Sequence, residues 1–337
     1  MKFDSLHLKR ALSAALFVLL LSVVGTKNAL AQNQMAVLQH DDTIKAYYGT
    51  DALVQAHAEA ADGDTITLSS GNFHSCDITK AITLHGAGCA SDTLGIAPTY
   101  ISNNCTINIQ NQSDCLTIQG VLFQNEVYYG QLYHADFIKC AFGSLGQSTS
   151  SDVPVHLENL RIINCLIGTA RIYPNIHDGV SIINSAIDHF SCPTNYTVSL
   201  FNSYFGLFSY PSNNLYLYNC IVSIKNSDVR NSYAYNCIEI RSAFHNSVQT
   251  FNCMHAETFS EVFETFDGTF SFNSEFHLNE EIANTFLGTD GREVGIYGGA
   301  MPYAPRPTYM RPYRCGVSGN TTTDGYLNVE VEVAPDE

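Results

Sequence analysis

An aromatic side chain stands one residue before each of several regularly spaced asparagines, and rings in such a row could bind sugars. Ile138, Ile163 and Ile183 open the row, and Phe201, Tyr218, Tyr235, Phe251 and Phe272 continue it. On parallel strands about 4.8 Å apart, outward rings would form a flat platform suited to stacking on sugar rings, whereas inward rings would form an aromatic core ladder. Strict alternation along a strand places them outward, but a bend can break the alternation, and the chain has no Trp to favour sugar stacking. We favour the core interpretation and keep the sugar platform as the alternative.

The densest group of acidic residues, with His255 nearby, could bind a cation. It comprises Glu257, Glu261, Glu264 and Asp267. Several carboxylates in one loop can supply the oxygen ligands that Ca²⁺ takes. Such a run is more often a solvated face, here of a short helical insertion with acids at i, i+4 and i+7. We therefore predict no metal site and keep these four residues as weak candidates.

The aromatic row belongs to an internal repeat, in which an apolar run ends in Asn and is followed by Cys or Ser. The repeated asparagines are Asn164, Asn184, Asn202, Asn219, Asn236, Asn252 and, in a looser copy, Asn273. Their spacing of 16 to 21 residues indicates stacked units, because one such unit cannot bury its apolar face alone. Asn tolerates positive φ, so each is expected to make a tight bend. Gly86, Gly120 and Lys139 occupy the same slot in earlier coils.

Units of this length have room for two or three short strands with their turns. They predict an all-β fold, a parallel β-helix of about ten coils. A leucine-rich repeat has an overlapping period, but only residues 157–164 approach its leucine spacing. Loops at residues 89–100 and 143–151 leave the coils, and such loops often carry function.

Five of the eleven cysteines stand directly after the bend residue. They are Cys140, Cys165, Cys220, Cys237 and Cys253, and Ser185, Ser203 and Ser274 take the same position in other repeats. Stacked coils would bring the Cα atoms within disulfide range, but the side chains would point the same way from parallel strands. We favour a buried ladder of free thiols over one or more disulfides.

The Ala-rich residues 50–61 predict a short helix, and an Asp-Gly-Asp turn separates it from the first alternating strand. Residues 52–73 and 82–88 resemble the start of the right-handed parallel β-helix proteins of the pectin lyase-like superfamily. Residues 287–299, with their Gly-Ile-Tyr-Gly-Gly turn, resemble the closing segment of many bacterial secreted β-helix proteins. The resemblance implies a right-handed solenoid plugged by the helix, and it defines a fold rather than a reaction.

Lyases and hydrolases of that superfamily use acidic clusters, because uronate lysis needs a bound cation with a strong base and hydrolysis needs paired carboxylates. The central coils are poor in both. Residues 186–189 resemble a Trp-Ile-Asp-His strand of pectate lyases but lack the Trp and any matching Arg-x-Pro-x-x-Arg. Asp188 and His189 are therefore weak catalytic candidates, and an exposed polar pair is favoured. Three carboxylates, or one carboxylate with Arg or Lys, converging in one groove would favour an enzyme.

The first 31 residues are typical of a cleavable secretory leader. Lys2, Lys9 and Arg10 precede an apolar run, and Ala29-Leu30-Ala31 supplies small residues for cleavage. We expect an exported protein, periplasmic or extracellular, without a transmembrane segment in its mature chain. The β-helix is expected over residues 32–299, and a Pro-rich segment with a C-terminal strand over 300–337.

Charge limits the partners of the exported chain. Loss of the leader changes the formal net charge from −16 to −19, since it removes four basic residues and one acidic residue. This argues against nucleic acid and against unassisted binding of polyuronates.

Two functions of different classes remain, and a structural surface component is a third. The favoured hypothesis is non-catalytic binding of a polysaccharide, cell-surface glycan or surface partner. The alternative is a polysaccharide lyase or glycoside hydrolase. No cofactor is expected, except Ca²⁺ if the protein is a lyase.

Overall fold

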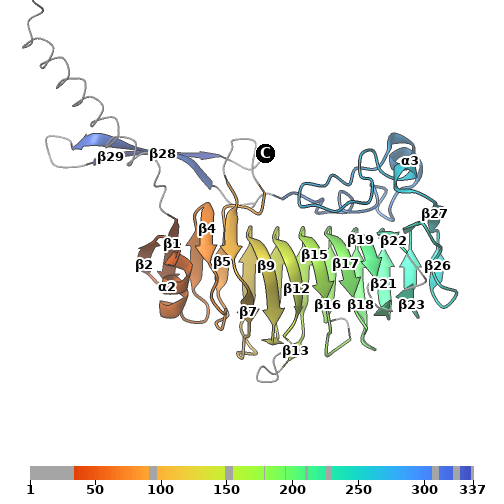
Figure 1. Ribbon diagram of the computed structural model, residues 1–337, viewed down its shortest axis with the longest axis horizontal. Coiled ribbons are helices and arrows are strands. Elements are labelled where there is room, and N and C mark those ends of the chain that lie inside the picture. Colours follow the sequence, from red (N-terminus) through yellow and green to blue (C-terminus); the bar gives the residue numbers. More distant parts are fainter. Residues whose placement is uncertain are drawn as a thin grey trace, which may run out of the picture.

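Each repeated asparagine turns the chain at the end of one strand, and the coils stack into a parallel β-solenoid of about nine turns (Figure 1). The structure, a computed structural model, describes residues 34–90, 97–148, 155–177, 179–193, 195–208, 212–224 and 229–305, and the backbone of 311–321 and 327–334. The predicted all-β parallel β-helix is confirmed, with about nine turns in place of about ten. The expected leader lies outside the described residues.

Sheet A, the larger sheet, has twelve strands. The two strand pairs at its N-terminal edge are antiparallel, and all other neighbouring strands of the sheet are parallel. In spatial order the strands are β2 (Thr43–Tyr48), β1 (Met35–His40), β3 (Thr65–Leu68), β5 (Thr83–His85), β8 (Leu116–Gln119), β11 (Ala135–Ile138), β14 (Leu160–Ile163), β16 (Val180–Ile183), β18 (Val198–Phe201), β21 (Leu215–Tyr218), β24 (Tyr233–Tyr235) and β26 (Gln249–Phe251). The antiparallel β1–β2 hairpin at the N-terminal edge was not predicted.

Sheet B, with eleven strands, follows the asparagine bends. Its strands are β4 (Gly71–His74), β6 (Thr99–Ser102), β7 (Cys105–Ile107), β9 (Leu122–Tyr129), β12 (Ala141–Gln147), β15 (Leu166–Arg171), β17 (Ala186–Ser191), β19 (Tyr204–Phe208), β22 (Ile221–Ser223), β25 (Ile238–Ile240) and β27 (Met254–Ala256). The core lies between the inner faces of the two sheets and is built from alternate apolar residues of each strand.

Three smaller strand pairs and the helices complete the described chain. The pairs are β10 (Gln131–Leu132) with β13 (His156–Leu157), β20 (Ser212–Asn213) with β23 (Val229–Arg230), and the antiparallel β28 (Arg311–Thr321) with β29 (Leu327–Ala334). The expected capping helix is α2 (Ala52–Glu59), whose Ala52, Leu53 and Ala56 are buried at the N-terminal end of the solenoid. α3 (Glu280–Thr285) and the 3-10 turn η1 (Phe259–Glu261) follow the last coil.

The bend residues have the predicted left-handed backbone in six repeats. From Asn164 to Asn252 their φ values run from 46° to 55°, and Lys139 and Gly120 in earlier coils also have positive φ. Two expectations are wrong. Gly86 is not among the positive-φ residues, and it must be Gly because a Cβ there would lie 2.4 Å from the Gly120 carbonyl oxygen. Asn273 lies in a turn beyond the last coil and does not extend the row.

The Cys/Ser ladder links successive coils by hydrogen bonds. The Cys165 thiol donates to the Ile163 carbonyl at 3.3 Å and accepts from the Cys140 amide at 3.4 Å. Ser185 repeats both contacts, to the Ile183 carbonyl and from the Cys165 amide. All five cysteines of the ladder are free thiols in the structure. Cys and Ser can replace one another because both side chains are small and each can donate and accept a hydrogen bond.

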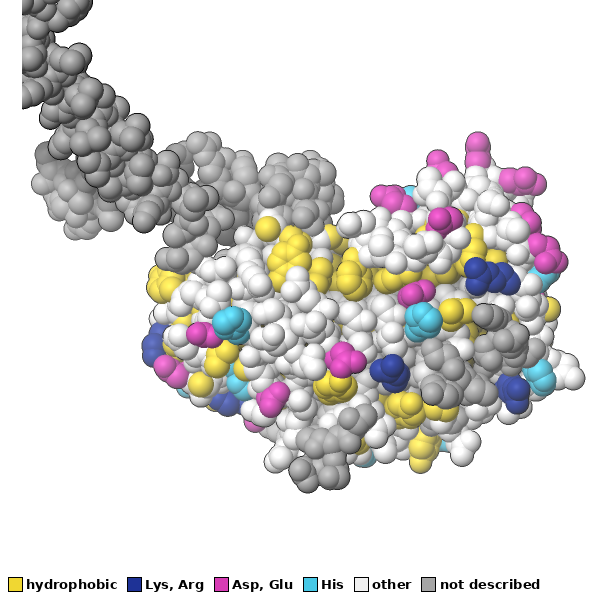
Figure 2. Space-filling view, in the orientation of Figure 1, with side chains coloured by type: hydrophobic (Ala, Val, Ile, Leu, Met, Phe, Trp, Pro, Cys, Tyr) yellow, Lys and Arg dark blue, Asp and Glu magenta, His cyan; other side chains and the backbone are white. Residues whose placement is uncertain are grey.

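After the last coil the chain returns along the asparagine bends (Figure 1). The Asn184 side-chain amide donates to the carbonyls of Ile296 and Gly298, and Asn236 donates to that of Leu287. Residues 257–305 bury a second apolar cluster against the outer face of sheet B, in which Tyr204 contacts Phe276 at a ring-centroid distance of 4.9 Å. Figure 2 shows a band of hydrophobic side chains along this edge, and acidic side chains gathered over the region of α3. In the described part of the chain, no helix has the length and hydropathy needed to span a membrane.

We predict that Cys165→Ser leaves the free energy of unfolding within about 1 kcal/mol of wild type, since a hydroxyl keeps the donor and the acceptor. Cys165→Val, of similar size, should lower it by about 1–3 kcal/mol, because the Cys140 amide then loses its buried acceptor. Urea unfolding followed by circular dichroism measures both. Equal losses in the two variants would show that packing of the sulfur, and not its hydrogen bonds, matters at this position.

Candidate functional site on the outer face of sheet A

Four members of the aromatic row stand on the outer face of sheet A. Phe201, Tyr218, Tyr235 and Phe251 are aligned on neighbouring strands. The residues before them on the first three strands, Leu200, Leu217 and Ala234, are fully buried in the core. The alternation is therefore kept up to the bend, and the favoured core interpretation is wrong. Phe272 is not part of the row, because it follows the last strand of the solenoid and packs beside Phe270.

The rings of this row stack on one another and do not form a flat platform. Successive centroids are 5.3, 4.9 and 4.6 Å apart, with interplanar angles of 11°, 6° and 6°. Rings lying side by side in one plane would overlap at these distances, so each ring covers a face of the next. Most ring faces are thus occupied within the row, and solvent meets mainly ring edges.

A second outward column lies two residues earlier on the same strands, and it contains an open ring face. Tyr216 stacks on Tyr233 with centroids 4.9 Å apart, and the residue aligned with Tyr216 on its other side is Ser199. A hollow of about 370 Å³ is present there, lined by Thr197, Ser199, Phe201, Tyr216 and Tyr218. The sequence carried a signal for this column, since Tyr216 and Tyr233 stand two residues before Tyr218 and Tyr235.

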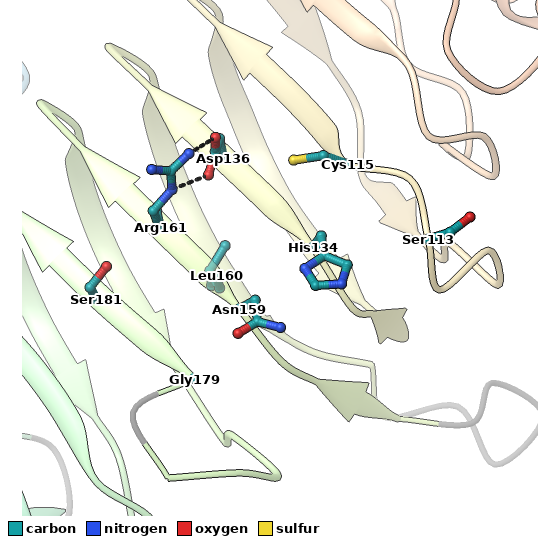
Figure 3. A pocket seen from close by; sticks show the side chains of 9 residues that line it. All are labelled: Ser113, Cys115, His134, Asp136, Asn159, Leu160, Arg161, Gly179 and Ser181. Atoms are coloured by element: carbon teal, nitrogen blue, oxygen red, sulfur yellow. Dashed lines mark hydrogen bonds and ion pairs between the residues drawn. The ribbon is translucent and has the colours of Figure 1, made fainter.

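A larger hollow of about 500 Å³ lies further along the same face (Figure 3). Its lining includes Cys115, His134, Asp136, Arg161 and Ser181. Asp136, Arg161, Ser181, Ser199 and Tyr216 are aligned on five neighbouring strands. The two hollows therefore adjoin between Ser181 and Ser199. We call the pair of hollows the sheet A trough.

Asp136 and Arg161 form the charged part of the trough. The Arg161 Nε donates to Asp136 Oδ1 at 2.6 Å and Nη2 donates to Oδ2, a bidentate pair that raises the pKa of the guanidinium (Figure 3). The Asp136 side chain is 12% exposed, whereas the Arg161 side chain is 59% exposed. One carboxylate and one arginine thus converge in one groove, and such an arrangement would favour an enzyme. Sequence reasoning missed both residues, although they occupy equivalent positions in successive repeats.

The trough does not activate the Cys115 thiol or the Tyr218 phenol as a nucleophile. Burial raises the pKa of Cys115, so its thiolate is disfavoured, and burial also raises the pKa of Tyr218. These groups are suited to contact and hydrogen bonding rather than to nucleophilic attack.

The weak catalytic candidates Asp188 and His189 lie on β17 in sheet B, away from the trough. The His189 Nε2 atom lies 3.5 Å from the Asp188 Oδ2 atom. Burial raises the pKa of Asp188, and the neighbouring His189 partly opposes the shift. Asp188 is flanked in the sheet by Gly168 and Gly206, where a Cβ at Gly206 would lie 2.6 Å from the Asp188 carbonyl oxygen. Close packing against the neighbouring backbone therefore explains why glycine stands at these positions, and no bound ligand is needed to explain it.

The acidic candidates Glu257, Glu261, Glu264 and Asp267 do not converge. The expected helical insertion is only the three-residue turn η1, and Glu261 accepts hydrogen bonds from the Glu257 amide and the Thr258 hydroxyl. Asp267 accepts from the Thr269 amide. Within the described ranges, no three His, Cys, Asp or Glu side chains are grouped to hold a metal ion.

Comparison with known proteins gave no family model, no curated protein and no solved structure that matches this chain significantly.

The outward position of the aromatic row predicts a modest effect of truncation on stability. Tyr235→Ala should lower the free energy of unfolding by about 1–3 kcal/mol, because the ring forms two stacked pairs, each worth about 0.5–1.5 kcal/mol. Tyr204→Ala should cost about 3–5 kcal/mol, because this ring is 1% exposed in the second apolar cluster. Urea unfolding of the two variants compares them directly, and a loss at Tyr235 as large as that at Tyr204 would contradict the outward assignment.

Proposed function

We propose that this protein is an exported β-helix of the pectin lyase-like type that binds a glycan, without cleaving it, on the outer face of sheet A. The observation that supports this most is the trough, where tyrosine and phenylalanine rings adjoin serine and threonine hydroxyls in a hollow of about 370 Å³. Aromatic rings contact the apolar faces of sugars, and hydroxyls exchange hydrogen bonds with their edges. Export through the leader is part of the same proposal.

Charge favours a neutral glycan. The chain has 32 acidic and 16 basic residues, so an acidic polymer meets a repulsive field unless cations bridge the two. In the trough the charges of Asp136 and Arg161 compensate each other, which leaves hydrogen-bonding groups without a net charge. A polysaccharide or cell-surface glycan built from neutral sugars fits this surface best.

An enzyme is the second candidate, because Asp136 and Arg161 share one groove. Among the residues that line the two hollows, Asp136 is the single carboxylate. Hydrolysis by the usual mechanism uses two carboxylates, and uronate lysis uses a bound cation such as Ca²⁺ together with a base. The carboxylate and the guanidinium here satisfy each other, which favours binding over chemistry.

We expect the protein to be retained by neutral glycans on an array, and Tyr218→Ala to weaken that retention about tenfold, a change of about 1.4 kcal/mol. Tyr218 lines the hollow, whereas Phe251 ends the same row outside it. Phe251→Ala is therefore the matched control and should change the affinity less than about twofold. If both variants bind like wild type, or no neutral glycan is retained, the proposal fails.

Incubation with neutral and acidic polysaccharides, with and without Ca²⁺, should release no new reducing ends and no unsaturated products. Cleavage that Asp136→Asn abolishes and Asp188→Asn preserves would replace the binding proposal by an enzyme whose reaction occurs in the trough.

A further inference from the structure

We propose that the trough takes one terminal residue of a neutral glycan, whose ring stacks on the open face of Tyr216 above Ser199. This inference rests on the proposed glycan-binding function and specifies which part of the glycan is recognised.

One face of the Tyr216 ring is open because of the two residues aligned with it on the neighbouring strands. Tyr233 covers one face of the ring, with centroids 4.9 Å apart, and the strand on the other side presents Ser199. Serine has no ring, so the stack stops there although the strands continue at about 4.8 Å. A ligand ring above Ser199 would extend the stack by one strand.

The walls of the hollow restrict how a sugar enters. The Tyr216 ring stacks along the solenoid axis. A sugar on its face therefore has its ring plane perpendicular to that axis, and its equatorial linkages point along the strands or away from the sheet. Phe201, two residues after Ser199, closes one side together with Tyr218, and Thr197 lies on the opposite side. An internal residue of a linear glycan would need both of these sides open, because the glycan continues in two directions. A terminal residue needs only one open side.

The size and chemistry of the hollow fit a single neutral hexose. Its volume of about 370 Å³ lies near the lower end of small-molecule sites, which span about 300–1,000 Å³. The Ser199 and Thr197 hydroxyls can bond sugar hydroxyls, and Thr197 is held by a 2.9 Å hydrogen bond with His177 Nδ1. Ser181 and the Asp136–Arg161 pair continue the polar floor toward the neighbouring hollow.

Replacing Ser199 by Tyr tests the site, because the new ring would itself stack on Tyr216 and occupy the ligand position. We expect Ser199→Tyr to weaken binding at least about tenfold while the protein stays folded. Gln249→Tyr is the matched control, since it adds a tyrosine at the opposite end of the same column, next to Tyr233. It should leave binding unchanged. Tyr216→Ala is a second variant that removes the stacking face and should also lose at least about tenfold.

The probes are methyl glycosides of glucose, galactose and mannose and linear oligosaccharides of these sugars, measured by saturation-transfer NMR and calorimetry. Binding of a methyl glycoside with a molar affinity close to that of the longer chains supports the terminal-residue site. Affinity that rises steadily with chain length and survives Ser199→Tyr overturns this site but leaves glycan binding by sheet A in place. Absence of binding by the wild-type protein to every probe and every arrayed glycan overturns both.

Discussion

One backbone conformation, repeated in successive coils from Gly120 to Asn252, underlies the stacking of the solenoid. A single residue with φ near +50° turns the chain out of sheet A and into sheet B, and the next coil must turn at the same place for its strands to pair. For most side chains this conformation costs about 1–2 kcal/mol, and Asn and Gly tolerate it best. The asparagine row is therefore what keeps successive coils in register.

Two further interactions depend on those bends. After three of the bends, the side chains of Cys165, Ser185 and Ser203 donate to the carbonyl two residues earlier and accept from an amide of the preceding coil. These hydrogen bonds tie neighbouring coils together through the interior. On the outside, the asparagine amides bind carbonyls of the returning C-terminal segment. The same residues thus shape the coil and hold the cover that buries the apolar outer face of sheet B.

The parallel stack also governs what sheet A can bind. Identical side chains on aligned strands lie at the strand spacing, so aromatic rings stack on each other and occupy their own faces. A ring face becomes available where a small residue interrupts a column, as Ser199 does beside Tyr216. Likewise, opposite charges at equivalent positions, as in Asp136 and Arg161, neutralise one another across neighbouring strands.

The solenoid could be predicted from the amino-acid sequence alone, because the period of the asparagines and the alternation of apolar residues are local properties of each repeat. The sequence also indicated the capping helix and the small residues after the bend. Which side chains meet could be seen only in the folded chain, since parallel pairing joins residues 16 to 34 positions apart, and their alignment depends on the length of each coil. The stacked rings, the Asp136–Arg161 pair and the open face of Tyr216 are contacts of this kind. The course of residues 257–305 was also decided by tertiary structure, because that segment does not repeat and is placed by the surfaces that it buries.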